Sequence, residues 1–175
     1  MHKIILIFAT LLFSTGAFAN SKGCDNGSLR GKFSYEVSGV NEFPLGVKMV
    51  TRSTHVVGQV TFDGSADANG LGEATFRGWG SAAGVTKSKT GSGTYMVNPA
   101  NCTAEGTMQW YQDDGITPSG LTSEYVIILD QMDNSRSPNR TYHANVLATD
   151  NVPGHPEFAG SASGTLTRLI MKPNH

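Results

Sequence analysis

Apolar and polar side chains alternate along most of the chain from residue 33 onward. The first such segment has Phe33, Tyr35 and Val37 on one side and polar residues on the other. A period of two is typical of a β-strand with one buried face. Seven further segments repeat the pattern, so the sequence predicts strands at about residues 33–37, 55–62, 73–79, 94–97, 104–110, 123–129, 141–149 and 158–169.

Between these segments the chain is rich in turn-forming residues. The stretches 41–46, 63–70, 81–89 and 113–120 combine Gly, Pro, Asp, Asn and Ser, and they are predicted as loops. The segment 123–129 ends in a run that is apolar on both faces, which predicts the most buried strand. No amphipathic pattern of helical length follows the first 19 residues.

Eight short strands joined by short connections are expected to pair antiparallel, because parallel pairing needs long crossovers. The sequence therefore predicts an all-β domain, a single eight-stranded antiparallel up-and-down barrel, in which closure removes exposed strand edges. A two-sheet β-sandwich is the alternative, because alternation alone fits both. The abundance of glycine (21 of 175 residues) and the low share of charged residues (15%, against a typical ~25%) agree with many tight turns.

Residues 1–19 have the features of a signal peptide. Lys3 precedes an apolar run of ten residues, and Ala17-Phe18-Ala19 forms a small-x-small cleavage site. We therefore expect a secreted or periplasmic protein whose mature chain, residues 20–175, forms one domain. A lipoprotein anchored through Cys24 is a weaker interpretation, because Lys22 lies just before that cysteine and the apolar run ends ten residues earlier.

The charge balance argues against polyanionic partners. The formal net charge of the chain is −1, which provides no positive field for nucleic acid or for an anionic membrane surface. The later segments are also too short to insert stably in a membrane as helices. We expect neither kind of partner, and the sequence does not identify a protein partner.

The two cysteines, Cys24 and Cys102, are predicted to form a disulfide bond, because export permits one. Their spacing gives no CxxC motif, which argues against a metal-binding or reactive pair. A bridge across 78 residues would stabilise the fold by roughly 4 kcal/mol in the chain-entropy model.

Four motifs together have a familiar pattern. They are Cys24 with Leu29-x-Gly31-x-Phe33, the run 58–64 (GQVTFDG), the run 91–99 (GSGTYMVNP) with Cys102, and 164–168 (GTLTR). The chain resembles a group of small exported bacterial β-barrel proteins of uncharacterised function, similar in shape to calycin and allene-oxide-cyclase-like barrels. The resemblance implies a barrel whose interior holds a small apolar molecule. It supplies no catalytic residue.

One loop resembles the start of a calcium site. Asp63, Ser65, Asp67 and Asn69 place oxygen atoms at every second position. The sixth position, where a calcium loop needs Gly, is Ala68, and the bidentate Glu expected at the twelfth is missing. An ordinary hairpin loop is therefore the preferred interpretation, with calcium binding as the alternative, and no other cofactor is expected.

Catalytic chemistry has little support in the sequence. There is no G-x-S-x-G motif, no spare cysteine and no histidine cluster. Acid–base residues are present, but most fall opposite the apolar stripes, where an exposed outer face is expected: Glu73, Glu105, Glu124, Asp130 and His143. We therefore name no catalytic residue, and an enzyme is the less favoured interpretation.

Aromatic residues dominate the apolar stripes. Those proposed to line a ligand site inside the barrel are Phe33, Tyr35, Phe62, Phe76, Tyr95, Trp110, Tyr125 and Tyr142, with Phe158 in the same stripe. The sequence predicts a non-catalytic binding protein for a small, largely apolar ligand. The alternatives are an isomerase- or cyclase-type barrel enzyme, and a surface interaction or structural protein that uses Trp79 or Tyr111.

Overall fold

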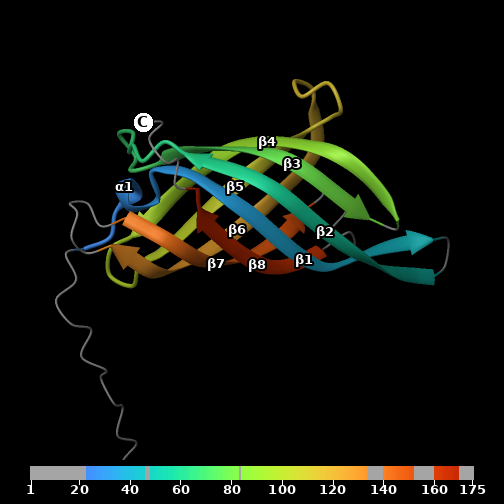
Figure 1. Ribbon diagram of the computed structural model, residues 1–175. Coiled ribbons are helices and arrows are strands. Elements are labelled where there is room, and N and C mark those ends of the chain that lie inside the picture. Colours follow the sequence, from blue (N-terminus) through green and yellow to red (C-terminus); the bar gives the residue numbers. More distant parts are fainter. Residues whose placement is uncertain (1–22, 46–47, 83, 134–139, 152–159, 170–175) are drawn as a thin grey trace, which may run out of the picture.

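The described strands close into one barrel. The computed structural model describes residues 23–45, 48–82, 84–133, 140–151 and 160–169. In these ranges, strands that are consecutive in the sequence are neighbours in the barrel wall, and β8 pairs with β1 (Figure 1). All neighbours are antiparallel, and the pairing of β8 with β1 closes the sheet, which confirms the barrel over the sandwich. The elements are α1 (Asn26–Leu29), β1 (Gly31–Leu45), β2 (Lys48–Phe62), β3 (Gly72–Ala82), β4 (Val85–Asn98), β5 (Thr103–Tyr111), β6 (Pro118–Asp133), β7 (Arg140–Asn151) and β8 (Gly160–Arg168).

The short helix α1 closes one end of the barrel. Cys24, which precedes it, is fully buried and forms the predicted disulfide with Cys102. Asn26 joins three parts of this end: its side-chain nitrogen donates to the carbonyl oxygens of Ser65 (2.7 Å) and Gly70 (3.0 Å), and its side-chain oxygen accepts from Val97 N (2.9 Å). The opposite end carries the hairpins β1–β2 and β3–β4 (Figure 1).

Two strand pairs extend further than the sequence predicts. The predicted loops at 41–46 and 81–89 are wrong. β1 continues to Leu45, β3 continues to Ala82, and β4 already begins at Val85. Among the described residues, β1 pairs with β8 only as far as Asn41, and Pro44 pairs with Met49 of β2. Proline is tolerated in a strand where its missing N–H is not needed for the ladder. The predicted loop at 113–120 also ends early, since β6 begins at Pro118.

β6 is not buried on both faces, which corrects the prediction for 123–129. Ile127 is 1% exposed, but Ile128 and Val126 are 53% and 37% exposed. The strand alternates like the others, because only one face of a small barrel wall packs against the core.

Inward-facing glycines let neighbouring strands approach one another closely. A Cβ atom on Gly93 would lie 1.8 Å from the carbonyl oxygen of Thr107, and one on Gly164 would lie 1.8 Å from that of Glu36. Such distances are excluded for real side chains. These glycines therefore serve the strong coiling of the wall, and they do not indicate an empty interior.

Candidate functional site

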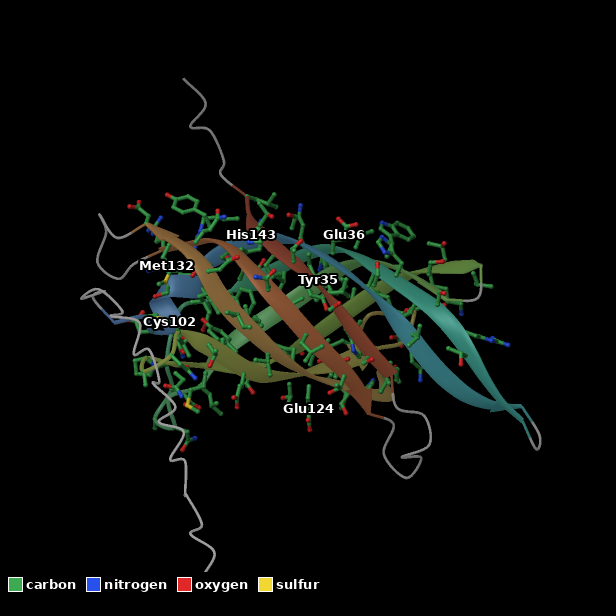
Figure 2. The ribbon with its side chains drawn as sticks, turned by 90° about the horizontal axis from the view of Figure 1, so that it is seen from below. Tyr35, Glu36, Cys102, Glu124, Met132 and His143 are labelled. Carbon is green, nitrogen blue, oxygen red and sulfur yellow. A yellow bond between two sulfur atoms is a disulfide. The ribbon has the colours of Figure 1, made fainter. Side chains whose placement is uncertain are left out.

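A small cavity lies inside the barrel, with a volume of about 30 Å³. The wall of the cavity is almost entirely apolar. Tyr35, which is part of that wall, lies within the barrel, whereas Glu36 and Glu124 lie on the outside of the barrel (Figure 2). The residues that line it are Tyr35, Val60, Phe62, Phe76, Met108, Trp110, Ser123, Tyr125, Ile127, Val146, Ala148 and Leu166.

Five of the eight aromatic residues predicted to line a ligand site border this cavity, namely Tyr35, Phe62, Phe76, Trp110 and Tyr125. The ring of Phe76 lies in the middle of the group, with its centroid 5.3 Å from that of Tyr35 and 5.1 Å from that of Trp110. Both contacts are edge-on, the geometry that aromatic pairs favour.

The other three predicted aromatics lie elsewhere. Phe33 and Tyr95 are fully buried towards the α1 end, and the Tyr95 hydroxyl accepts from Gly64 N (2.9 Å). Burial raises the pKa of the Tyr95 phenol. Tyr142 is half-buried outside the cavity lining, with its hydroxyl 3.4 Å from Asp133. Phe158 lies outside the described residues.

The polar atoms of the cavity wall have partners. Trp110 Nε1 donates to Ser123 Oγ (2.6 Å), a group that is 3% exposed. The hydroxyl of Tyr125 donates to the carbonyl oxygen of Thr94 (3.1 Å), and burial raises its pKa. The lining contains neither a carboxylate nor a histidine. The cavity is therefore suited to an apolar group and offers no general base that works near neutral pH.

The register of the wall carries this interior surface towards the end of the barrel that bears the β1–β2 and β3–β4 hairpins, called the hairpin end below. Tyr35 pairs with Leu166 on β8 and with Gly58 on β2, Gly58 pairs with Gly78 on β3, and Gly78 pairs with Lys89 on β4. Directly paired residues of antiparallel strands point to the same face. Lys89 therefore shares the inner face with two cavity residues, and it is half-buried.

Sequence reasoning missed Lys89 as an inward residue. The signal is present, because Lys87, Lys89, Gly91, Gly93 and Tyr95 occupy every second position of one strand. The loop predicted over 81–89 makes this strand begin too late in the sequence. The alternation therefore does not extend to the lysines at its start.

The proposed calcium loop is held by its own hydrogen bonds. Asp67 Oδ1 accepts from the backbone nitrogens of Asn69 (2.8 Å) and Leu71 (2.9 Å), and these bonds hold its pKa below the ordinary value. Asp63 accepts from Ser65 N and Glu73 N. These are turn and strand contacts, as the hairpin interpretation predicts.

The acidic residues and histidines considered for catalysis lie outside the cavity. His143 Nδ1 is 3.0 Å from Asp130 on the neighbouring strand. His55 Nδ1 is 2.6 Å from Ser38 Oγ, and both residues are exposed. Among the described residues, no group of three or more His, Cys, Asp or Glu side chains is arranged to hold a metal ion.

The two predicted surface aromatics differ. Trp79 is 59% exposed on the outer wall, where it pairs with Val57 of β2. Tyr111 is only half-exposed, and its hydroxyl lies 2.6 Å from Ser92 Oγ.

Helical structure in the described ranges has neither the length nor the apolar character that crossing a membrane requires.

Comparison with protein-family models and with curated proteins finds no match. Among solved structures, a LolA superfamily protein from Nitrosomonas europaea is similar at a TM-score of 0.21 and 7% sequence identity, over 84% of this chain and 91% of that chain. A likeness of this size carries no argument about function, so the argument below rests on the geometry of the barrel.

Proposed function

We propose that this is an exported, non-catalytic binding protein for a small, largely apolar molecule, which it holds inside the barrel. The observation that carries the proposal is an apolar, aromatic cavity whose wall continues along the inner face towards the hairpin end. Tyr35 is partly exposed, and so offers contact to a molecule that enters from that end.

The size of the cavity limits what can enter. A volume of about 30 Å³ holds about two water molecules, since each needs roughly 10–15 Å³ by this measure. A ligand therefore inserts only a narrow apolar group, or displaces a side chain. Met108 is the side chain best suited to move, because it is unbranched and its sulfur fills the space beside Gly91.

The test is binding of N-phenyl-1-naphthylamine, an uncharged apolar probe that fluoresces when shielded from water. We expect saturable binding to the oxidised protein. Replacing Ala148, a cavity residue, with Phe fills the space and abolishes binding, whereas Ala100→Phe, in an exposed turn, leaves it unchanged. Absence of binding to the native protein, or equal binding to the Ala148→Phe variant, would overturn the proposal.

A second candidate is a surface interaction protein. It is favoured by the small cavity together with the exposed indole of Trp79. This candidate predicts that Trp79→Ser removes binding to a protein partner while the naphthylamine probe never binds. An isomerase or cyclase gains less support, because the cavity lining contains neither a carboxylate nor a histidine.

A further inference from the structure

Beyond the apolar site, the geometry points to a ligand with an acidic head group, a carboxylate, phosphate or sulfonate, which pairs with the ammonium group of Lys89 while its apolar part rests on Trp110 and Phe76. This inference rests on the proposed function, because the apolar part must bind in the barrel for the head group to be placed. It names the chemical class of the ligand as an acidic amphiphile.

The first support is the distance between Lys89 and the cavity wall. Gly91 pairs with both Phe76 and Trp110, which border the cavity. Lys89 is two residues further along β4 on the same face, which is about 7 Å at the spacing of an extended strand. The stem of Lys89 runs on towards Gly80, the partner of Lys87, so a molecule that touches the two rings must extend beyond this distance to meet the ammonium group with its other end.

The second support is the position of the Phe76 ring beside the residue that pairs with the lysine. Gly58 and Gly78 lie on the inner face between Tyr35 and Lys89, and neither has a side chain. The ring of Phe76 covers Gly78, with its Cζ atom 2.9 Å from where a Cβ of Gly78 would be. The aromatic wall therefore reaches the residue that pairs directly with Lys89.

The third support is the placement of the lysine side chain. Its stem crosses Gly80, where an added Cβ would lie 3.1 Å from Cγ and 3.2 Å from Cε of Lys89. The neighbouring cation, Lys87, already has an acidic neighbour, with Nζ 3.7 Å from Asp113. Among the described residues no salt bridge is formed by Lys89. Within the part of the chain that the structure describes, Lys89 is therefore a cation on the inner face that forms no ion pair and can meet an acidic ligand.

The test compares two probes that differ by one charged group. 1-Anilinonaphthalene-8-sulfonate has the same ring system as N-phenyl-1-naphthylamine and adds a sulfonate. The measured quantity is the ratio of the two dissociation constants, which removes the shared apolar contribution. We expect Lys89→Gln to lower the relative affinity for the sulfonate by about 3-fold at low ionic strength, the size typical of an exposed ion pair. Lys89→Glu should lower it further.

The control is Lys32→Gln, which removes the same charge from an exposed position on the outer face of β1. It should leave the ratio unchanged, and about 1 M salt should abolish the difference between native protein and Lys89→Gln, since the Debye length is then about 3 Å. An unchanged ratio in Lys89→Gln, or an equal change in Lys32→Gln, overturns the inference while binding of the neutral probe still supports the proposed function. If neither probe binds, both fall.

Discussion

The guanidinium group of Arg168 lies over the ring of Phe33, with its central carbon 4.6 Å from the ring centroid. Arg168 comes from the end of β8 and Phe33 from the beginning of β1, the two strands whose pairing closes the barrel. The same side chain donates to the carbonyl oxygens of Thr141 (2.6 Å), Arg30 (2.5 Å) and Ser28 (3.1 Å). One residue therefore ties the last strand, the first strand and the segment around α1 together.

Removing this side chain should destabilise the α1 end. Arg168→Ala leaves three backbone carbonyls without a charged donor and removes the cation–π contact with Phe33. We expect a loss of about 3–5 kcal/mol in the free energy of unfolding, measured by urea denaturation of the oxidised protein. Arg77→Ala, at an exposed outer position, is the matched control and should change it by about 0.5 kcal/mol or less. Equal effects of the two substitutions would refute this role.

Much of the fold follows from alternation, which predicts strands and their inner faces. It could not predict the exposure of Ile128, because β-branched residues favour strands on either face. A run of apolar residues therefore does not show which of its members face the solvent. It also ended β1 before Pro44, since whether a strand tolerates a proline depends on how it pairs with its neighbours, which alternation does not show. The inward position of Lys89 could not be predicted either, because it depends on where β3 ends and β4 begins.

The small inward residues of the strands are a second feature that the sequence alone leaves open. Small inward residues were consistent with either a cavity or a tightly coiled wall, and the choice depends on distances between strands. At Gly106 the ring of Tyr125 occupies the place of the missing side chain, with its hydroxyl oxygen 2.6 Å from the position of a Cβ. A glycine in one strand therefore made room for an aromatic residue of the next, which no pattern within one strand reveals.

The close approach of β4 to β5 makes a prediction about Gly93. A Cβ atom there would collide with the carbonyl oxygen of Thr107, so Gly93→Ala must push the two strands apart. We expect a loss of at least about 3 kcal/mol in stability, seen as a lower melting temperature. Gly23→Ala is the control, because the nearest side-chain atom to its Cβ would be 4.0 Å away, on Pro99. A Gly93→Ala variant as stable as the control would mean that the strands are further apart.

The carboxyl group of Asp63 predicts a specific dependence of stability on pH. Burial alone would raise its pKa, but hydrogen bonds from Ser65, Glu73 N and the Tyr95 hydroxyl outweigh burial, and the net pKa is below the ordinary value. A lowered folded-state pKa means that this contribution is present above about pH 4 and is lost as the pH falls through the folded-state pKa.

Urea denaturation at several pH values from about 6 to about 2 tests this expectation. Asp63→Asn should lower the stability near pH 6 and reduce the decline below about pH 4, because the charged acceptor is gone. Glu105→Gln, at an exposed position, should follow the native curve. If Asp63→Asn kept the native slope at acid pH, the hydrogen bonds of Asp63 would not be stabilising its charged form.

The last prediction concerns Met108, which we expect to limit entry to the barrel. It is 6% exposed, borders the cavity and lies against Gly91, where an added Cβ would be 3.0 Å from its sulfur. Met108→Ala should therefore enlarge the cavity and raise the affinity for N-phenyl-1-naphthylamine, at a cost of about 2–3 kcal/mol in stability. Met96→Ala, at a side chain that is 49% exposed on the outer wall, should change neither. Because a cavity-forming substitution destabilises the protein whether or not a ligand enters, the affinity is the decisive measurement. Weaker probe binding by folded Met108→Ala would show that the methionine is part of the binding surface and does not obstruct it.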